Sequence, residues 1–157
     1  MYRATTALRK LVNAGKFLEL PTAHDALTGR LIESVGFKSL YVGGFVTGGS
    51  TAISEPQLTM SEQIRVASDI ANGLKIPVVM DAGAGWGEPL HTMRTIRECI
   101  RAGIAGVHIE DQLFPKRAHY HTYVAHNIPI NEYRDKIKLA CAQRDETDKD
   151  FVIIARS

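Results

Sequence analysis

Cysteine and long hydrophobic segments are scarce in this sequence. It has two cysteines in 157 residues, Cys99 and Cys141, and both fall in segments with helical periodicity. Their number and placement indicate neither a disulfide framework nor a zinc motif, so we expect a reducing, cytoplasmic compartment. No apolar run approaches the roughly 18 residues that a membrane span requires. Secreted disulfide-rich proteins and transmembrane proteins are therefore the first classes to be set aside.

Clustered charge of either sign is also lacking. The chain carries 19 Lys and Arg residues against 17 Asp and Glu residues, a net charge of +2, and the basic residues are scattered. This distribution argues against nucleic-acid and membrane-surface partners. Neither a Gly-x-Gly-x-x-Gly nor a Walker pattern occurs, so no nucleotide site is indicated.

The N-terminal segment has no acidic residue before Glu19, a trait that it shares with transit peptides. However, Ala4, Leu8 and Leu11 recur at helical spacing, and Gly15 stands where a helix stop belongs. We therefore predict a structural N-terminal helix.

Short apolar segments alternate with amphipathic ones along the rest of the chain. Several apolar segments are near-continuous runs of Val and Ile, which is typical of parallel strands buried on both faces. Asp25 and Ser61 are the predicted N-caps of the first two amphipathic helices. The predicted strands are residues 16–23, 39–44, 76–85, 104–111 and 150–157, and the predicted helices are residues 25–36, 60–74, 89–103 and 130–146.

Two parallel α/β architectures compete for this order of elements. An open doubly wound sheet suits the length of 157 residues, whereas a (β/α)₈ barrel needs about 250. Yet the chain stops directly after a strand, with no helix to cover it. We therefore predict a (β/α)₈ TIM-type barrel truncated after its fifth strand, as a single partial barrel domain over residues 1–157 with an N-terminal helix.

Polar and glycine residues collect where the predicted strands end, which is where parallel α/β folds place their chemistry. The segment after the second strand holds Gly43, Gly44, Gly48 and Gly49. Its backbone N–H groups could bind an anion, or the segment could simply be a flexible loop. The sequence leaves both interpretations open.

Acidic residues end the third and fourth predicted strands. Asp81 is suited to bind Mg²⁺ because hard cations favour oxygen ligands, although it could equally cap the next helix. Glu88 lies nearer that helix and is the better candidate for a structural role. Strand alternation predicts that His108 and Glu110 share one side, so Asp81 and Glu110 could converge on one cation.

Cationic and imidazole side chains follow Glu110 closely. Lys116 and Arg117 suit an anion clamp for a carboxylate or phosphate, but they could also be ordinary solvated charges. His119 and His121 form a His-x-His pair, with His126 further along. No third ligand at a recognised spacing follows, so a transition-metal site is the less favoured interpretation.

Four stretches in combination resemble the isocitrate lyase/phosphoenolpyruvate mutase superfamily, especially its short methylisocitrate lyase-like members. The resemblance implies a (β/α)₈ barrel that binds Mg²⁺ and an α-oxo or α-hydroxy acid, often with its last helix swapped between subunits. It also implies an enolate-like intermediate, whose negative charge the metal and backbone N–H groups stabilise. The four stretches are LPTAHDALTGRLIESVGFKSLYVGG, IPVVMDAGAGWGEP, AGVHIEDQLFPKR and DFVIIARS.

The resemblance assigns roles to individual residues. Asp81 and Glu110 would hold the metal, and Gly43 and Gly44 would offer N–H donors to the substrate. Arg156 would hold a substrate carboxylate. Lys116 and Arg117 would begin the catalytic loop that closes over the site.

The chain departs from the superfamily pattern at several of these motifs. Gly83 replaces the second acid of the metal motif, and Ala118 replaces the catalytic Cys of the lyase branch. Gly43 stands where lyases carry Ser, and Glu55 where an Asp is usual. These changes argue against isocitrate or methylisocitrate cleavage in the usual manner. His119 or His121 would then take over proton transfer, since an imidazole suits neutral pH.

We expect a Mg²⁺-dependent lyase or decarboxylase that cleaves a C–C bond of a small carboxylic acid. The alternatives are a C–P bond mutase or hydrolase of phosphonopyruvate type and a non-catalytic acid-binding relative. A partial barrel leaves an open strand edge, and open edges pair with whatever is available. We therefore expect either a homo-oligomer or a missing C-terminal part.

Overall fold

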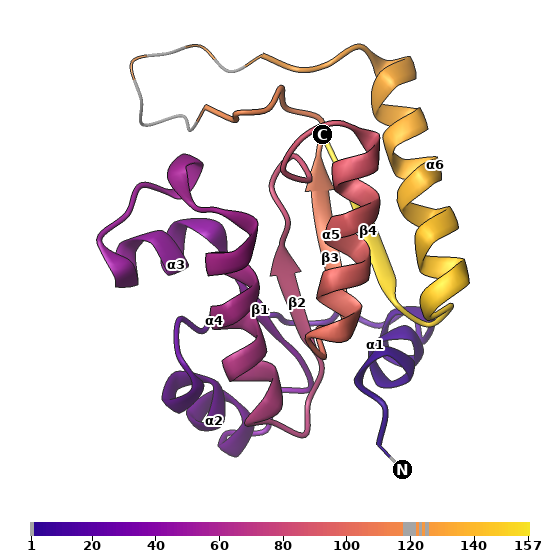
Figure 1. Cartoon of the computed structure of the whole chain (residues 1–157). Helices are drawn as coiled ribbons and strands as arrows, with labels where there is room; N and C mark the ends of the chain where they lie inside the picture. Colours follow the sequence, from indigo (N-terminus) through magenta and orange to yellow (C-terminus); the bar gives the residue numbers. More distant parts are fainter. Residues whose placement is uncertain (1, 118–121, 123, 125) are drawn as a thin grey trace.

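A parallel sheet forms the centre of the computed structural model, which describes residues 2–117, 122, 124 and 126–157. The described residues form four strands in the order β1-β2-β3-β4, namely β1 Leu40–Val42, β2 Val78–Asp81, β3 Gly106–Glu110 and β4 Val152–Arg156 (Figure 1). Strand order follows chain order without the reversal that marks a doubly wound sheet. This confirms the parallel α/β fold expected of the barrel family and argues against the open alternative.

The first predicted strand, residues 16–23, is largely wrong. Thr22 makes a single parallel bridge to Tyr41 of β1, and the other described residues of the segment belong to no strand. The bridge rests on two hydrogen bonds, from the Tyr41 N–H to the Pro21 carbonyl and from the Ala23 N–H to the Tyr41 carbonyl. Pro21 has no N–H, so it cannot extend the ladder toward the N-terminus.

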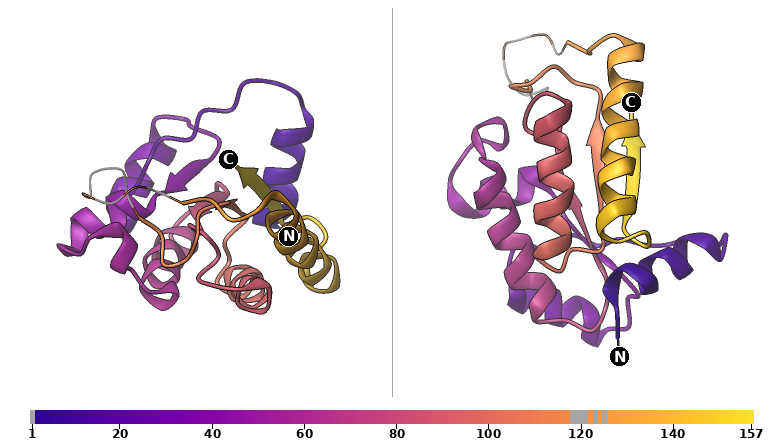
Figure 2. Two further views of the ribbon diagram at one scale, coloured as in Figure 1. Left: turned by 90° about the horizontal axis from the view of Figure 1, so that it is seen from above. Right: turned by 45° about the vertical axis from the view of Figure 1, so that its right-hand side comes forward.

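Three helices cover one face of the sheet. They are α4 (Met60–Asn72), α5 (Pro89–Arg101) and α6 (Ile130–Thr147), which run side by side in both views of Figure 2. The remaining longer helices are α1 (Ala4–Asn13) and α2 (Ala26–Ser34). Among the described residues, no helix is long and apolar enough to cross a membrane.

Helix starts were only partly predictable. Asp25 caps α2 as predicted, because its carboxylate accepts the Thr28 N–H at 2.7 Å. Ser61 is not the cap of α4. Thr59 takes that role in a reciprocal capping box with Glu62, a motif that satisfies two backbone donors at once.

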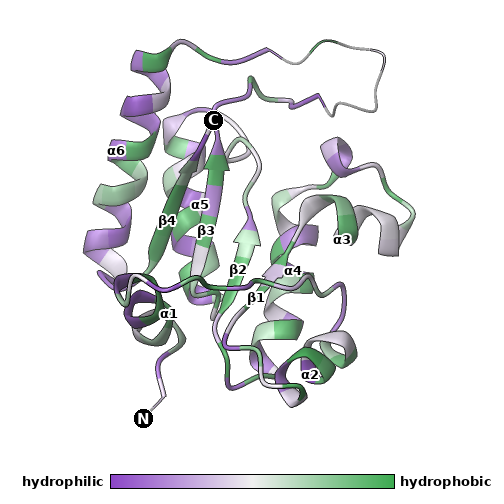
Figure 3. Ribbon diagram, turned by 180° about the vertical axis from the view of Figure 1, so that it is seen from behind, coloured by the Kyte–Doolittle hydropathy of each residue, from purple (hydrophilic) through white to green (hydrophobic). Residues whose placement is uncertain are grey.

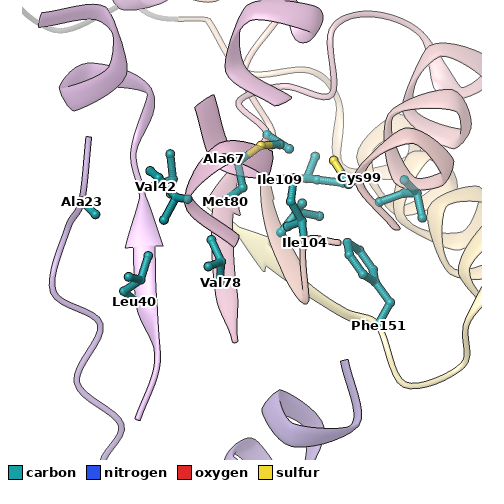
Figure 4. Packing of buried hydrophobic residues seen from close by; sticks show 14 of the residues in the cluster. Ala23, Leu40, Val42, Ala67, Val78, Met80, Cys99, Ile104, Ile109 and Phe151 are labelled. Atoms are coloured by element: carbon teal, nitrogen blue, oxygen red, sulfur yellow. The ribbon is translucent and has the colours of Figure 1, made fainter. Parts of the chain in front are cut away.

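The main core lies between the sheet and helices α4–α6. Val42, Met80 and Ile109 from three successive strands pack there, with Ile104 and Phe151 just before the strands (Figure 4). A smaller cluster covers the other face, where Leu8 of α1 packs on Val79, Ala105 and Val152. Figure 3 shows α1 near the N-terminal ends of the strands, so α1 leaves their C-terminal ends clear.

The glycine-rich segment after β1 is a helix and not a flexible loop. It forms α3 (Gly44–Thr51), followed by the short 3₁₀ helix η1 (Glu55–Gln57). Gly48 allows the return of the chain, because a Cβ there would lie 2.4 Å from the Ile53 carbonyl oxygen. This fold-back brings Glu55 to the strand ends.

Candidate active site

Asp81 and Glu110 end neighbouring strands and line the same pocket at the C-terminal edge of the sheet. Asp81 is 7% exposed and Glu110 is 3% exposed. The Asp81 carboxylate is fixed from two directions, because Oδ1 accepts the Gly83 N–H at 2.7 Å and Oδ2 accepts the Gly44 N–H at 3.3 Å. The structure thus brings Asp81, Glu110 and Gly44 together.

Lys116 reaches into this pocket from the segment after β3. Its Nζ lies 2.5 Å from Oε1 of Glu55 and 2.9 Å from Oε1 of Glu110. Burial alone would lower the pKa of Lys116, but the bond to Glu55 and the charges of Asp81 and Glu110 raise it. Lys116 therefore stays protonated and partly balances the surrounding carboxylates.

Tyr41 lines the pocket, and His108 stacks against it. The Tyr41 hydroxyl contacts Nε2 of His108, and the two rings stack with an interplanar angle of 11°. Nδ1 of His108 lies 3.7 Å from Oδ1 of Asp81. Burial lowers the pKa of His108, and it raises the pKa of Tyr41 with help from the Asp81 charge. Both side chains are therefore neutral at physiological pH.

No local motif of the sequence points to Tyr41. Alternation along β3 predicts that His108 lies on the side of Glu110, and the contact of His108 with Asp81 agrees with that side. The alternation of β1 contains the matching signal, because Leu40 and Val42 are buried in the core while Tyr41 is half-buried. Without the strand register, nothing links Tyr41 to His108.

The rim of the pocket carries the cationic side chains. Nη1 of Arg156 lies 3.6 Å from Oε2 of Glu110, and the Arg156 side chain is 55% exposed. Arg117 also lines the pocket, and its Nη1 is 3.4 Å from the Val124 carbonyl oxygen. Gly43 completes this side, where a Cβ would lie 3.1 Å from Cε1 of Tyr41. Carboxylates thus form the base of the pocket and guanidinium groups its rim.

Asp111 takes no part in this arrangement. Asp111 follows Glu110 directly but turns away, because its Oδ2 accepts the Ser157 hydroxyl at 2.9 Å. His119 and His121 lie outside the described residues, so their role stays a prediction.

The donor chemistry of the pocket fits a hard divalent cation. Oε1 of Glu110 is buried, and no hydrogen bond of acceptable direction from the described residues reaches it, although Nζ of Lys116 is near. Within the same part of the chain, no three His, Cys, Asp or Glu side chains are grouped closely enough to enclose a metal ion. Mg²⁺ usually keeps several waters and needs only one or two protein carboxylates. Asp81 and Glu110 therefore suit Mg²⁺ better than a transition metal.

Comparison with known proteins agrees with this geometry. Residues 8–157 match the sequence profile of the phosphoenolpyruvate phosphomutase family. The chain belongs to this family. It is 35% identical over 153 residues to 2,3-dimethylmalate lyase from Eubacterium barkeri, an alignment that covers 96% of this chain and 52% of that protein. The resemblance to the isocitrate lyase/phosphoenolpyruvate mutase superfamily is therefore confirmed.

Solved structures of the family superpose closely on the chain. The phosphoenolpyruvate phosphomutase of Streptomyces platensis subsp. rosaceus matches with a TM-score of 0.90 and 32% identity, over 98% of this chain and 53% of that one. A phosphonopyruvate hydrolase in complex with oxalate and Mg²⁺ matches with a TM-score of 0.88 and 30% identity, over 98% of this chain and 52% of that one. The chain thus spans about half the length of the family members that it matches.

Proposed function

We propose that this family member is a Mg²⁺-dependent lyase or decarboxylase that cleaves a C–C bond of a small α-oxo or α-hydroxy carboxylic acid. One observation carries the proposal. Asp81 and Glu110, which suit Mg²⁺, line the same pocket as Arg156, which suits a carboxylate. A metal-chelating acid needs both features within a few ångströms of each other.

Each residue of the pocket has a proposed task. Asp81 and Glu110 hold the cation, with Asp81 oriented by the Gly44 and Gly83 N–H groups. When bound, Mg²⁺ would supply positive charge to stabilise the oxyanion that develops as the C–C bond breaks. Arg156 binds the substrate carboxylate, and Lys116 adds a second positive charge beside it. The uncharged His108 packs behind Tyr41 and beside Asp81 and adds no charge there.

The remaining residues act on binding and on proton transfer. Gly43 and Gly44 lie at the N-terminal end of α3 and would both face the substrate. Gly43 would donate its backbone N–H to the substrate, while the Gly44 N–H holds Asp81. Arg117 would close over the bound acid. His119 or His121 would return a proton to the carbon left by bond cleavage, in place of the Cys that this chain lacks at Ala118.

A second candidate is C–P bond chemistry, because phosphonopyruvate hydrolase from Variovorax sp. is 31% identical to this chain over 152 residues. A third is acid binding without turnover, which Gly83 and Ala118 favour. A cytoplasmic location and a homo-oligomeric state are part of the first proposal. The two free cysteines, Cys99 and Cys141, support the location.

The test is turnover of oxaloacetate, methylisocitrate and phosphonopyruvate with and without Mg²⁺. We expect Mg²⁺-dependent cleavage of a C–C substrate, reduced about 10²-fold or more by Asp81→Asn. Asp111→Asn is the matched control, because Asp111 also follows a strand end but is bonded to Ser157. Cleavage of phosphonopyruvate alone would establish the second candidate, and tight oxalate binding without turnover of any substrate would establish the third.

A further inference from the structure

A lysine is buried beneath the loop that carries Asp81. Lys136 lies on α6, is 4% exposed, and donates from Nζ to the Ala84 carbonyl oxygen at 3.0 Å. Its neighbours on the same helix face, Tyr133, Ile137 and Ala140, belong to the hydrophobic core. Burying an ammonium group among apolar side chains is costly unless the charge is paired and hydrogen-bonded. Desolvation indeed lowers the pKa of Lys136, although Glu88 and Glu132 partly offset this.

The loop that receives this bond has an unusual backbone. Gly83, Gly85, Trp86 and Gly87 all have positive φ, and Trp86 at φ 54° is one of two described non-glycine residues with this conformation. A non-glycine residue in this conformation is strained and persists only where its surroundings hold it. The loop between β2 and α5 must therefore be held from outside.

Anchors at successive peptide groups supply that restraint. The Gly83 N–H donates to Asp81, and the Gly83 carbonyl accepts the Glu110 N–H at 2.9 Å. The Gly85 carbonyl accepts the Thr95 hydroxyl at 3.2 Å. Between these two, the Ala84 carbonyl is bound by Lys136. Of the three bonds to the carbonyl groups of Gly83, Ala84 and Gly85, only the bond to Ala84 comes from a charged side chain and from α6.

We infer that Lys136 is a positioning residue that fixes the Asp81–Gly87 loop, and through it the orientation of the Asp81 carboxylate toward a bound cation. Lys136 does not touch the pocket itself. Its effect passes through Ala84 to Gly83, whose N–H orients Asp81. The part of this inference that concerns Mg²⁺ rests on the proposed function, whereas the part that concerns the loop does not.

The loop contains its own reporter, because Trp86 is the single tryptophan of the 157 residues. The Trp86 indole is half-buried, and its Nε1 donates to the Leu58 carbonyl oxygen at 3.0 Å. Its emission and its quenching by acrylamide therefore report how well the loop is held, with or without metal. Far-UV circular dichroism reports the rest of the fold separately.

The experiment compares Lys136→Met with Lys136→Arg and with the control Lys138→Met. Lys138 is two residues away on α6, is 64% exposed, and pairs with Asp135 at 3.2 Å. In Lys136→Met we expect acrylamide quenching of Trp86 to rise about twofold, and Mg²⁺ affinity measured by calorimetry to fall about 10-fold or more, the scale for residues that orient metal ligands. Lys136→Arg should recover part of both, and Lys138→Met should match the wild type.

Three outcomes distinguish a failure of the Lys136 inference from a failure of the proposed function. Unchanged quenching in a folded Lys136→Met protein would overturn the inference. A Lys136→Met protein that does not fold would also overturn it, because the effect would then be global and not local to the loop. A wild-type protein that binds no Mg²⁺ would count against the proposed function, and the quenching comparison would still decide the role of Lys136.

Discussion

Nζ of Lys116 lies 2.9 Å from Oε1 of Glu110 and 2.5 Å from Oε1 of Glu55, so one ammonium group joins a buried and a partly buried carboxylate. The bond to Glu55 connects the segment after β3 to the short helix after α3. It also places a positive charge beside the carboxylates that we assign to Mg²⁺. A cation bound by Asp81 and Glu110 would therefore interact with the same carboxylates as Lys116.

The first prediction concerns Lys116→Met. Removing one partner leaves Glu55 and Glu110 without their counter-charge, so we expect a loss of roughly 2–3 kcal/mol in the free energy of unfolding. Added Mg²⁺ should restore more stability to the variant than to the wild type, because it meets no competing ammonium group. Urea unfolding with and without Mg²⁺ measures both effects. An equal gain from Mg²⁺ in both proteins would contradict the shared-charge account.

The second prediction concerns the missing carboxylate at Gly83. Gly83→Asp should bind Mg²⁺ about 10-fold more tightly, because ligand charge count raises affinity. The backbone at Gly83 has φ 48°, which strains any side chain, but Asp and Asn adopt positive φ more readily than most residues. A Cβ there would meet only Cδ of Lys116, at 3.6 Å. Gly83→Asn has the same shape without the charge and is the control. Equal Mg²⁺ affinities by calorimetry for the wild type and both variants would contradict this prediction.

The third prediction concerns the proton donor. If the protein is a lyase or decarboxylase, His119→Ala or His121→Ala should lower kcat by about 10²-fold or more. The complementary variant is Ala118→Cys, which restores the thiol of the lyase branch and should raise turnover. Steady-state kinetics with the best substrate found for the wild type provides the measurement. Full activity in both histidine variants would shift attention to Tyr120 or Tyr123.

The fourth prediction concerns the Tyr133 hydroxyl, which ties the ends of β3 and β4 together. It donates to the Ile109 carbonyl oxygen at 2.6 Å, lies 3.1 Å from the Arg156 carbonyl oxygen, and accepts the Arg156 N–H at 2.9 Å. Tyr133→Phe should therefore cost about 1–2 kcal/mol in the free energy of unfolding at pH 7.

The pH dependence of that difference has a definite sign. Burial raises the pKa of Tyr133 above its ordinary value near 10. The contribution of the neutral phenol is then fully present below about pH 10 and is lost as the pH rises through the raised value. Urea unfolding of wild type and Tyr133→Phe at pH 7, 9 and 11 measures this. The difference in the free energy of unfolding should be the same at pH 7 and pH 9 and smaller at pH 11. A difference that grows at pH 11 would mean that the hydroxyl does not act as a donor.

The fifth prediction concerns association of the 157-residue chain. Leu27 and Leu31 of α2, and Val35 directly after it, are 69%, 59% and 72% exposed. Ile154 of β4 is 40% exposed on a strand with one paired edge among the described residues. Surfaces of this kind associate, so we expect light scattering to show more than a monomer and Leu31→Lys to reduce the associated fraction. A monodisperse, active monomer would refute this.

How far the sequence predicts this molecule depends on the range of the interactions involved. The order of helices and the later strands followed from periodicity, and the Asp25 cap from local chemistry. The segment of residues 16–23 has a strand-like composition, but its pairing depends on where Tyr41 lies, so local pattern alone misled. The glycine-rich stretch after β1 forms α3 because the chain folds back tightly at Gly48, which is a tertiary effect.

The site shows the same division. Asp81 and Glu110 were predictable because both end apolar runs, and parallel strands end at one edge. The ion pair of Lys116 with Glu55, and the contact of Tyr41 with His108, each join residues from different strands or loops. Strand register and loop path decide such contacts, and neither can be read from one segment. Lys136 carried no signal at all, because a lysine in an amphipathic helix is normally at the surface.

The Asp81 carboxylate is oriented by the backbone N–H groups of Gly83 and Gly44, and neither bond comes from a side chain at position 83. The superfamily motif can therefore lose its second acid without turning the first one. Having Gly83 in place of an acid removes one negative charge from the pocket, while the orientation of the Asp81 carboxylate stays the same. Evolution can thus alter how strongly a member of this family holds its cation, or whether it holds one, through a single codon and without reshaping the loop.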